Sequence, residues 1–331
     1  MKIIESVDEM RDYSRQLKRD GKIVSLIATD GALHKGHMRL IEVAKNNSDI
    51  VISNIDSTIF YHRYLLNNSY DYKYFSTKFK KEDEQLCKSN GVDVLFRPDP
   101  KEFFPHGLAI NIKVSCTSLE RLNKEFPHNP PTRKIIIGRF IHDFNVIMPD
   151  LILLGQKDAF QTWVIKEILK ILNFPIEVII VPTVRDKDNV AYTSRLIKID
   201  NKERLKCIYQ ALQEVASWDD FPSIAKIKNY IEYKILENGG TIKYVVVCCP
   251  ETMNELDSLN PSDSEGDLAI LIVCAKFDGV SFCDNIAIKC KSKINLILEN
   301  MGKSKIVDEP SSKIVDEPAL WSDPDKVYFN D

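Results

Sequence analysis

Short apolar runs alternate with longer helical segments along the first 180 residues, and this alternation restricts the possible folds more than any other feature. The run at 22–28 is apolar and too short for a helix, so it predicts a buried strand. A helix-like stretch at 38–46 and a second apolar run at 50–53 follow it. The order strand, helix, strand predicts one βαβ unit.

The same alternation continues toward the middle of the chain. A polar helical segment at 72–89 precedes a strand-like run at 92–96. Further on, a strand is predicted at 151–155, a helix at 159–172 and another strand at 176–181. Repeated units of this kind predict an α/β fold of the Rossmann-like, doubly wound type, with a parallel sheet covered by helices on both faces.

The second half of the chain has a different order. Two helical stretches come first and two apolar runs follow them, at 201–217, 224–238, 244–249 and 268–275. The pair Asp278-Gly279 then predicts a tight turn into a strand at 285–288. Helices followed by strands predict a smaller α+β domain at the C-terminal side.

The length of the chain and a repeated charged segment near its end predict how it is divided into domains. With 331 residues the chain exceeds the size of one hydrophobic core, so two domains are expected, at 1–185 and 186–290. Residues 291–331 contain the segment S-K-I-V-D-E-P twice, at 304–310 and 312–318, which predicts a charged, flexible tail.

Composition excludes several classes of function. The formal charge is -3, so the chain has no basic excess for neutralising a nucleic-acid backbone. No run approaches the ~20 apolar residues of a membrane helix, and the N-terminus is acidic too early for a secretory signal, so no membrane partner and a cytoplasmic location are expected. The eight cysteines show no C-x-x-C spacing and are expected to be reduced core residues.

The first predicted strand runs into the segment D-G-A-L-H-K-G-H, at residues 30–37. His34 and His37 lie three residues apart at the start of the first predicted helix, where free backbone N–H groups and the helix dipole favour a phosphate. Gly36 has no side chain and so leaves room for the phosphate to approach the backbone closely. Two histidines can also bind zinc, but no third ligand lies nearby, so the phosphate interpretation is favoured.

Two later segments also follow predicted strands. G-Q-K-D-A-F-Q at 155–161 opens a helix at the carboxyl edge of the sheet, where open α/β folds bind ligands. P-T-V-R-D at 182–186 leads to Y-T-S-R at 192–195, which offers hydroxyl groups and a guanidinium to a triphosphate.

Together, these three segments strongly resemble the pantothenate synthetase (pantoate–β-alanine ligase) family over roughly residues 1–290. The resemblance implies an AMP-forming ligase that uses ATP and Mg²⁺. The carboxylate of the acid would attack the α-phosphorus of ATP, and the amine of β-alanine would then attack the acyl-adenylate. It also implies a homodimer, and a C-terminal domain that acts as a lid.

Site residues follow from the same resemblance, position by position. The residues implied to be catalytic are His34, His37, Lys157, Ser194 and Arg195, with His37 as the proton donor. Those implied to line the nucleotide site are Asp30, Gly31, Gly36, Gly155, Gln156, Asp158, Val184, Tyr192 and Thr193. Mg²⁺ would be carried by the ATP phosphates rather than by a protein cluster.

On the acid side, Gln161 matches a family glutamine, whereas other positions depart from the pattern. Asp30 stands where the family has methionine, and Ile59 stands where it has a glutamine that binds the acid. Residues 129–133 differ from the family's R-P-G-H-F, and Arg139 occupies a position that is normally small and apolar. These changes indicate either drift around pantoate or a pocket rebuilt for a more polar acid, with Asp30 and Arg139 as its contacts.

Three functions therefore remain open from the sequence. The first is ligation of pantoate with β-alanine. The second is a divergent ligase or adenylyltransferase that acts on another, more polar small acid. The third is a non-catalytic descendant that retains nucleotide binding.

Overall fold

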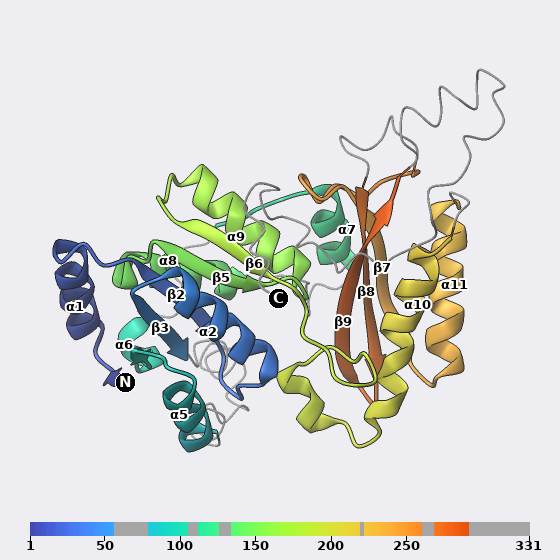
Figure 1. Ribbon diagram of the computed structural model, residues 1–331. Coiled ribbons are helices and arrows are strands. Elements are labelled where there is room, and N and C mark those ends of the chain that lie inside the picture. Colours follow the sequence, from blue (N-terminus) through green and yellow to red (C-terminus); the bar gives the residue numbers. More distant parts are fainter. Residues whose placement is uncertain (56–78, 105–111, 126–133, 219–221, 260–267, 291–331) are drawn as a thin grey trace, which may run out of the picture.

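The structure is a computed structural model that describes residues 1–55, 79–104, 112–125, 134–218, 222–259 and 268–290. Figure 1 shows a larger part built on one sheet and a smaller part, with its own sheet, packed beside it. The predicted segments at 56–78, 129–133 and 291–331, including Ile59 and the repeated tail, lie outside the described residues.

The larger part contains a six-stranded sheet in the order β1-β4-β3-β2-β5-β6. All of its strand pairs are parallel. The strands are β1 (Lys2–Ile4), β2 (Val24–Thr29), β3 (Ile50–Ile55), β4 (Val94–Phe96), β5 (Leu151–Gly155) and β6 (Glu177–Val181). The predicted Rossmann-like parallel sheet is therefore confirmed, although the sequence did not reveal β1 as its edge strand.

Helices cover both faces of this sheet because successive strand residues point to opposite sides. One face packs its side chains against α2 (Lys35–Asn47) and α5 (Lys80–Ser89). The other packs against α1 (Val7–Arg19), α6 (Pro100–Phe103), α8 (Lys134–Ile147) and α9 (Ala159–Ile171). Neighbouring residues illustrate the alternation, since Leu26 belongs to the second core and Ile27 to the first.

The strand order reverses between β2 and β5, since β3 lies beyond β2 on one side and β6 beyond β5 on the other. Loops that leave these two central strands diverge to opposite faces and open a crevice at the carboxyl edge. β2 ends at Thr29 and β5 at Gly155, so the two motifs at 30–37 and 155–161 start at this crevice.

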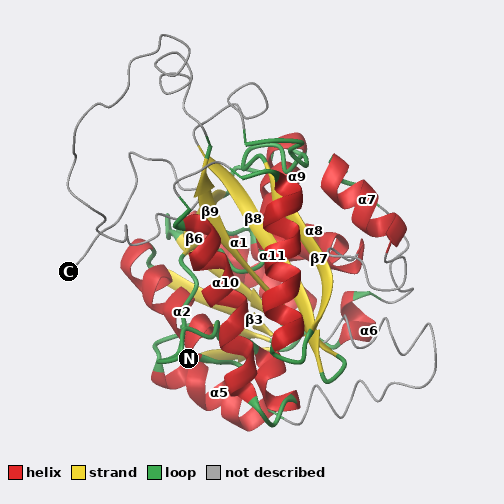
Figure 2. Ribbon diagram, turned by 90° about the vertical axis from the view of Figure 1, so that its right-hand side faces the viewer, coloured by secondary structure: helices red, strands yellow, loops and turns green. Residues whose placement is uncertain are grey.

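The smaller part is an antiparallel sheet covered by helices, as predicted. Its strands, in the order β7-β8-β9, are β7 (Thr241–Cys248), β8 (Leu268–Phe277) and β9 (Val280–Lys289). Asp278 and Gly279 both have positive φ, 49° and 78°, which confirms the tight turn. Figure 2 shows α10 (Lys206–Ala216) and α11 (Ile224–Glu237) side by side on the outer face of this sheet. Two short 3₁₀ helices, η1 (Ser194–Lys198) and η2 (Lys202–Leu205), connect the two parts.

The inner face of the small sheet packs on the larger part. One hydrophobic cluster joins α9 and α7 (Thr117–Glu125) to residues of β7 and β8. Trp163 of α9 also donates a hydrogen bond to the carbonyl of Glu251 across this boundary (2.8 Å). The small sheet is therefore held beside the carboxyl edge of the large one. Within the described residues, none of the helices has the length and apolar character needed to cross a membrane.

One expectation about the cysteines is wrong. Cys274 on β8 and Cys283 on β9 are register partners, with Cα atoms 4.1 Å apart, and they form a disulfide. The sequence shows their separation of 9 residues but not the register of the hairpin that brings them together. The other six cysteines are free and buried, as expected.

Candidate active site

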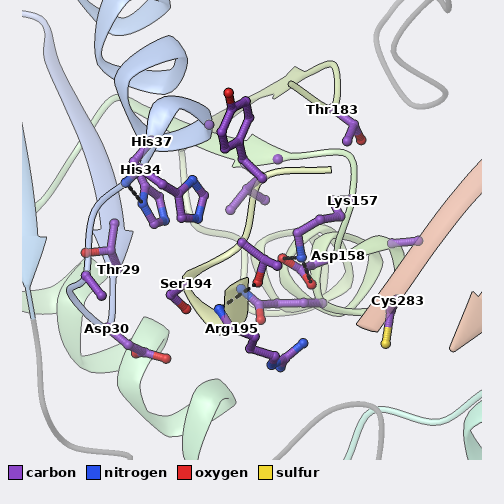
Figure 3. A pocket seen from close by; sticks show the side chains of 18 of the residues that line it. Thr29, Asp30, His34, His37, Lys157, Asp158, Thr183, Ser194, Arg195 and Cys283 are labelled. Atoms are coloured by element: carbon purple, nitrogen blue, oxygen red, sulfur yellow. Dashed lines mark hydrogen bonds and ion pairs between the residues drawn. The ribbon is translucent and has the colours of Figure 1, made fainter. Parts of the chain in front are cut away.

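A cavity of about 610 Å³ lies at the point where the strand order reverses, between the large sheet and β8–β9. Its lining includes residues from all three predicted motifs and from the small sheet (Figure 3). Of the residues proposed from the sequence, those that line the cavity are Asp30, Gly31, His34, Gly36, His37, Arg139, Gly155, Lys157, Asp158, Gln161, Val184, Tyr192, Thr193, Ser194 and Arg195.

Gln156 is placed elsewhere. Its side chain is fully buried, it is not among the residues that line the cavity, and neither of its amide atoms has a hydrogen-bond partner among the described residues. Its backbone carbonyl accepts a hydrogen bond from Asn285. A role in positioning the loop therefore agrees better with this location than direct contact with a nucleotide.

His34 and His37 stack on each other at the start of α2, with ring centroids 3.9 Å apart. The backbone N–H of His34 donates to Nδ1 of His37 (3.3 Å). Because this nitrogen accepts, the proton of the neutral His37 ring lies on Nε2, which is left as the hydrogen-bond donor of the ring. The local structure thus selects the tautomer of His37.

Both imidazoles favour the neutral form. Burial, followed by the charge of Lys157, lowers the pKa of His34 to about 4. Burial, followed by His34 and Lys157, lowers the pKa of His37 well below its usual range. At neutral pH the two rings are therefore neutral, and each has one N–H group to donate, rather than being permanent cations.

Two glycines of the first motif lie at positions that disfavour a side chain. A Cβ on Gly36 would lie 3.0 Å from the ring of His34, so this glycine allows the His34 ring to fold back over the helix start. Gly31 has φ +82°, a conformation that favours glycine. The loop between them is held by Asp83, whose carboxylate accepts from the N–H groups of Ala32 (2.9 Å) and Leu33 (2.7 Å).

Asp83 is a functional residue that the sequence analysis missed. Only 4% of the residue is exposed, and burial raises its pKa despite the two backbone donors. It reaches the motif from α5, about 50 residues further along the chain, so no local pattern marks it. By fixing residues 32 and 33, it fixes the start of α2 and hence both histidines.

Cationic groups lie across the cavity from the end of β2. Lys157 pairs with Asp158 (2.9 Å) and its side chain is 15% exposed. Thr193 caps η1 by accepting from the N–H of Arg195 (3.3 Å), which places Ser194 and Arg195 at the first turn of that helix. Figure 3 shows Lys157, Arg195 and Ser194 around the same space as the two imidazoles.

Two neighbouring residues of β9 hold both of these loops. Asp284 accepts two hydrogen bonds from the guanidinium of Arg185 (2.6 and 3.0 Å), and both side chains are nearly buried. Asn285 donates to the carbonyls of Gln156 (3.0 Å) and Lys157 (2.9 Å). The structure assigns Asp284 to the loop before η1 and Asn285 to the loop before α9.

Next to the end of β2, on the side of the cavity that the sequence assigned to the acid, Arg139 of α8 is 4% exposed and lies beside Asp30. It bonds to the carboxylate of Asp30 and donates to the carbonyl of Thr29 (2.6 Å). Its Nε lies 3.6 Å from a carboxylate oxygen of the fully buried Asp143. The two sequence departures at 30 and 139 are therefore one ion pair.

The donor set suits phosphate oxygens better than a metal ion. Among the described residues, no group of three or more His, Cys, Asp or Glu is arranged to hold a metal. An ammonium, a guanidinium, a hydroxyl and two neutral imidazole donors instead surround the cavity near two helix starts.

The fold and site together place the chain in the class of doubly wound α/β proteins that carry an H-x-G-H segment where the strand order reverses. Comparison with known proteins makes this specific. The sequence model described as "Pantoate-beta-alanine ligase" matches residues 2–287, so the chain belongs to the pantoate–β-alanine ligase family.

Individual relatives agree with this assignment. The pantothenate synthetase of Caldicellulosiruptor saccharolyticus is 30% identical over 296 residues, which is 87% of this chain and 100% of that protein. The one from Geobacillus kaustophilus is 29% identical over 294 residues, covering 87% and 93% of the two chains.

Solved structures agree at the level of the fold. The pantothenate synthetase of Thermus thermophilus superposes with a TM-score of 0.71 at 24% identity, covering 86% of this chain and 99% of that one. The pantoate–β-alanine ligase of Francisella tularensis, solved with an ATP ligand and β-alanine, gives a TM-score of 0.65 at 24% identity, covering 86% and 97%.

Proposed function

We propose that this protein is an ATP-dependent, AMP-forming ligase that joins pantoate to β-alanine through an acyl-adenylate. The observation that carries the proposal is the cavity where the strand order reverses, in which His34, His37, Lys157 and Arg195 surround one space. Membership of the family and the names of its relatives, including one solved with an ATP ligand and β-alanine, support this assignment of substrates.

In the first half-reaction, the protein would mainly position groups and stabilise charge. We assign Lys157 and Arg195 to the phosphate oxygens as cations, with the Ser194 hydroxyl and the N–H groups at the start of α2 as further donors. The Nε2–H of His37 would donate to the oxygen that takes up charge as pyrophosphate leaves. The negative charge that develops on this oxygen would strengthen the hydrogen bond that it accepts from the Nε2–H group.

The nucleotide would extend along the loops after β5 and β6. We place the triphosphate beside Lys157 and Asp158, with Tyr192, Thr193 and Ser194 across from them and Val184 toward the base. Gln161, on the first turn of α9, would hold the acid at the same cavity. Mg²⁺ would neutralise phosphate charge and be held by the phosphates.

In the second half-reaction, the amine of β-alanine would attack the carbonyl carbon of the acyl-adenylate and release AMP. Water would hydrolyse this intermediate, so the site has to exclude it. We assign this role to residues 186–290, whose strands β8 and β9 already contribute Ile272 and Ser281 to the cavity wall. The family likeness further suggests a homodimer and a cytoplasmic location.

Exchange of labelled pyrophosphate into ATP in the presence of pantoate tests the first half-reaction, and formation of pantothenate on addition of β-alanine tests the second. We expect both. Exchange with a different short acid but not with pantoate would support a ligase for a more polar acid. Absence of exchange with any acid would contradict the proposal and favour a non-catalytic nucleotide-binding protein.

A further inference from the structure

The acid side of the cavity contains a charge network that begins in the core and ends at the substrate space. Asn54 of β3 and Asp143 of α8 are both fully buried, and the amide of Asn54 donates to the carboxylate of Asp143. Arg139 lies beside Asp143 and bonds to Asp30, whose side chain is 43% exposed. Three of the four members are thus buried, and the fourth reaches the cavity.

This arrangement determines which charged group the network presents to the cavity. One guanidinium lies between two carboxylates, so its charge is already neutralised within the protein by Asp143 and Asp30. The carbonyl of Thr29 accepts a further hydrogen bond from the guanidinium of Arg139 (2.6 Å). What the network presents to the cavity is therefore the carboxylate of Asp30, a hydrogen-bond acceptor held in place by a buried arginine.

The place of Asp30 in the cavity determines which end of the acid substrate it would meet. Figure 3 shows Asp30 beside Thr29, on the side of the cavity away from Lys157 and Asp158. An acid whose carboxylate faces the α-phosphate near the cationic groups directs its other end away from them. That far end would then lie toward Asp30.

We propose that Asp30, held by Arg139, determines specificity by accepting a hydrogen bond from a hydroxyl group at the far end of the acid. The inference rests on the proposed function. An aliphatic end would remove water from the carboxylate without donating a hydrogen bond in its place, and a second carboxylate would meet a like charge. The substrate class is therefore an acid with a terminal hydroxyl, to which pantoate belongs, and neither plain aliphatic acids nor diacids.

Arg139 acts through Asp30 and is a positioning residue. It is buried behind the carboxylate and bonds to it, so it fixes the direction of the acceptor. An apolar residue at position 30 would offer only packing contacts to this end of the acid. The pair thus replaces shape complementarity with a hydrogen bond as the means of selection.

The test compares two acids in the pyrophosphate exchange assay: pantoate, and its analogue in which the terminal CH₂OH is a methyl group. We expect the wild-type protein to favour pantoate in kcat/KM by at least about tenfold. Asp30→Leu should bring this ratio close to one by lowering kcat/KM for pantoate. Asp30→Asn keeps an amide carbonyl as acceptor and should retain part of the preference.

The outcomes separate the inference from the function on which it rests. A wild-type ratio near one, or an equal loss for both acids in Asp30→Leu with the preference kept, overturns the assignment of Asp30 alone. Absence of exchange with either acid in the wild-type protein overturns the proposed function, and the inference with it. Asp30→Asn is nearly isosteric, so it provides the comparison if Asp30→Leu does not fold.

Discussion

The two ends of the cavity are built differently. At the end proposed for the phosphates, called the phosphate end below, each group comes from a short segment that follows a strand: His34 and His37 after β2, Lys157 after β5, and Arg195 after β6. At the end proposed for the acid, Asp30, Arg139, Asp143 and Asn54 come from three separate segments of the chain and are mostly buried. The phosphate end therefore uses local backbone geometry, whereas the acid end uses contacts that exist only after folding.

The largest effect is expected at the acid end, on stability. Arg139→Met leaves Asp143 fully buried without its cation, so the free energy of unfolding should fall by roughly 3–5 kcal/mol. Urea denaturation followed by circular dichroism measures this. In the matched control, Arg139→Met combined with Asp143→Leu, the buried charge is also removed and most of the stability should return. A single variant as stable as the wild type would show that the network is not a buried ion pair in solution.

The next effect belongs to the phosphate end and concerns catalysis. His37→Ala removes the Nε2–H donor, so the rate of pyrophosphate exchange should fall by about 100-fold to 1000-fold, as for loss of one preorganised donor. Arg39→Ala, on the exposed side of the same helix, is the control and should exchange normally. Unchanged exchange in His37→Ala would show that the phosphates do not bind at the start of α2.

A smaller effect is expected behind the phosphate end. Asn285→Ala removes both hydrogen bonds to the loop that carries Lys157, which should cost about 1–3 kcal/mol. The effect should appear as a KM for ATP raised about tenfold, with the preference between the two acids unchanged. Lys289→Ala at the exposed end of β9 should have no effect. A changed acid preference would show that the two ends are not independent.

The difference between the ends also explains how much the sequence could predict. The strands, the crevice and the phosphate-end residues follow from periodicity and from motifs adjacent to strand ends, all of which are local. Asp83 and Asn285 were not recognised as loop holders, because their partners lie about 50 and about 130 residues away. For the same reason, Asp30 and Arg139 were seen as two departures from a family pattern rather than as one pair.

The smallest predicted effect is a dependence of stability on pH that arises from the histidines of the phosphate end. Since His34 has a pKa of about 4 in the folded chain and about 6.5 when unfolded, the unfolded state binds more protons between these values. Stability should therefore be complete above pH 6.5 and fall as the pH decreases, by about 1 kcal/mol for His34 between pH 6 and pH 5. Urea midpoints measured across this range test the slope.

His34→Gln is the matched control, because glutamine cannot titrate. The variant should show a shallower decrease in stability between pH 6 and pH 5, and the remaining slope should come partly from His37, whose pKa is also lowered by burial. Arg139→Met should leave the His34 slope intact, since Arg139 does not titrate in this range. An identical slope in the wild type and His34→Gln would mean that the His34 ring is solvated in the folded protein. The stacked, neutral histidine pair would then have to be abandoned for the chain without nucleotide, while the ion pair at the acid end would stand.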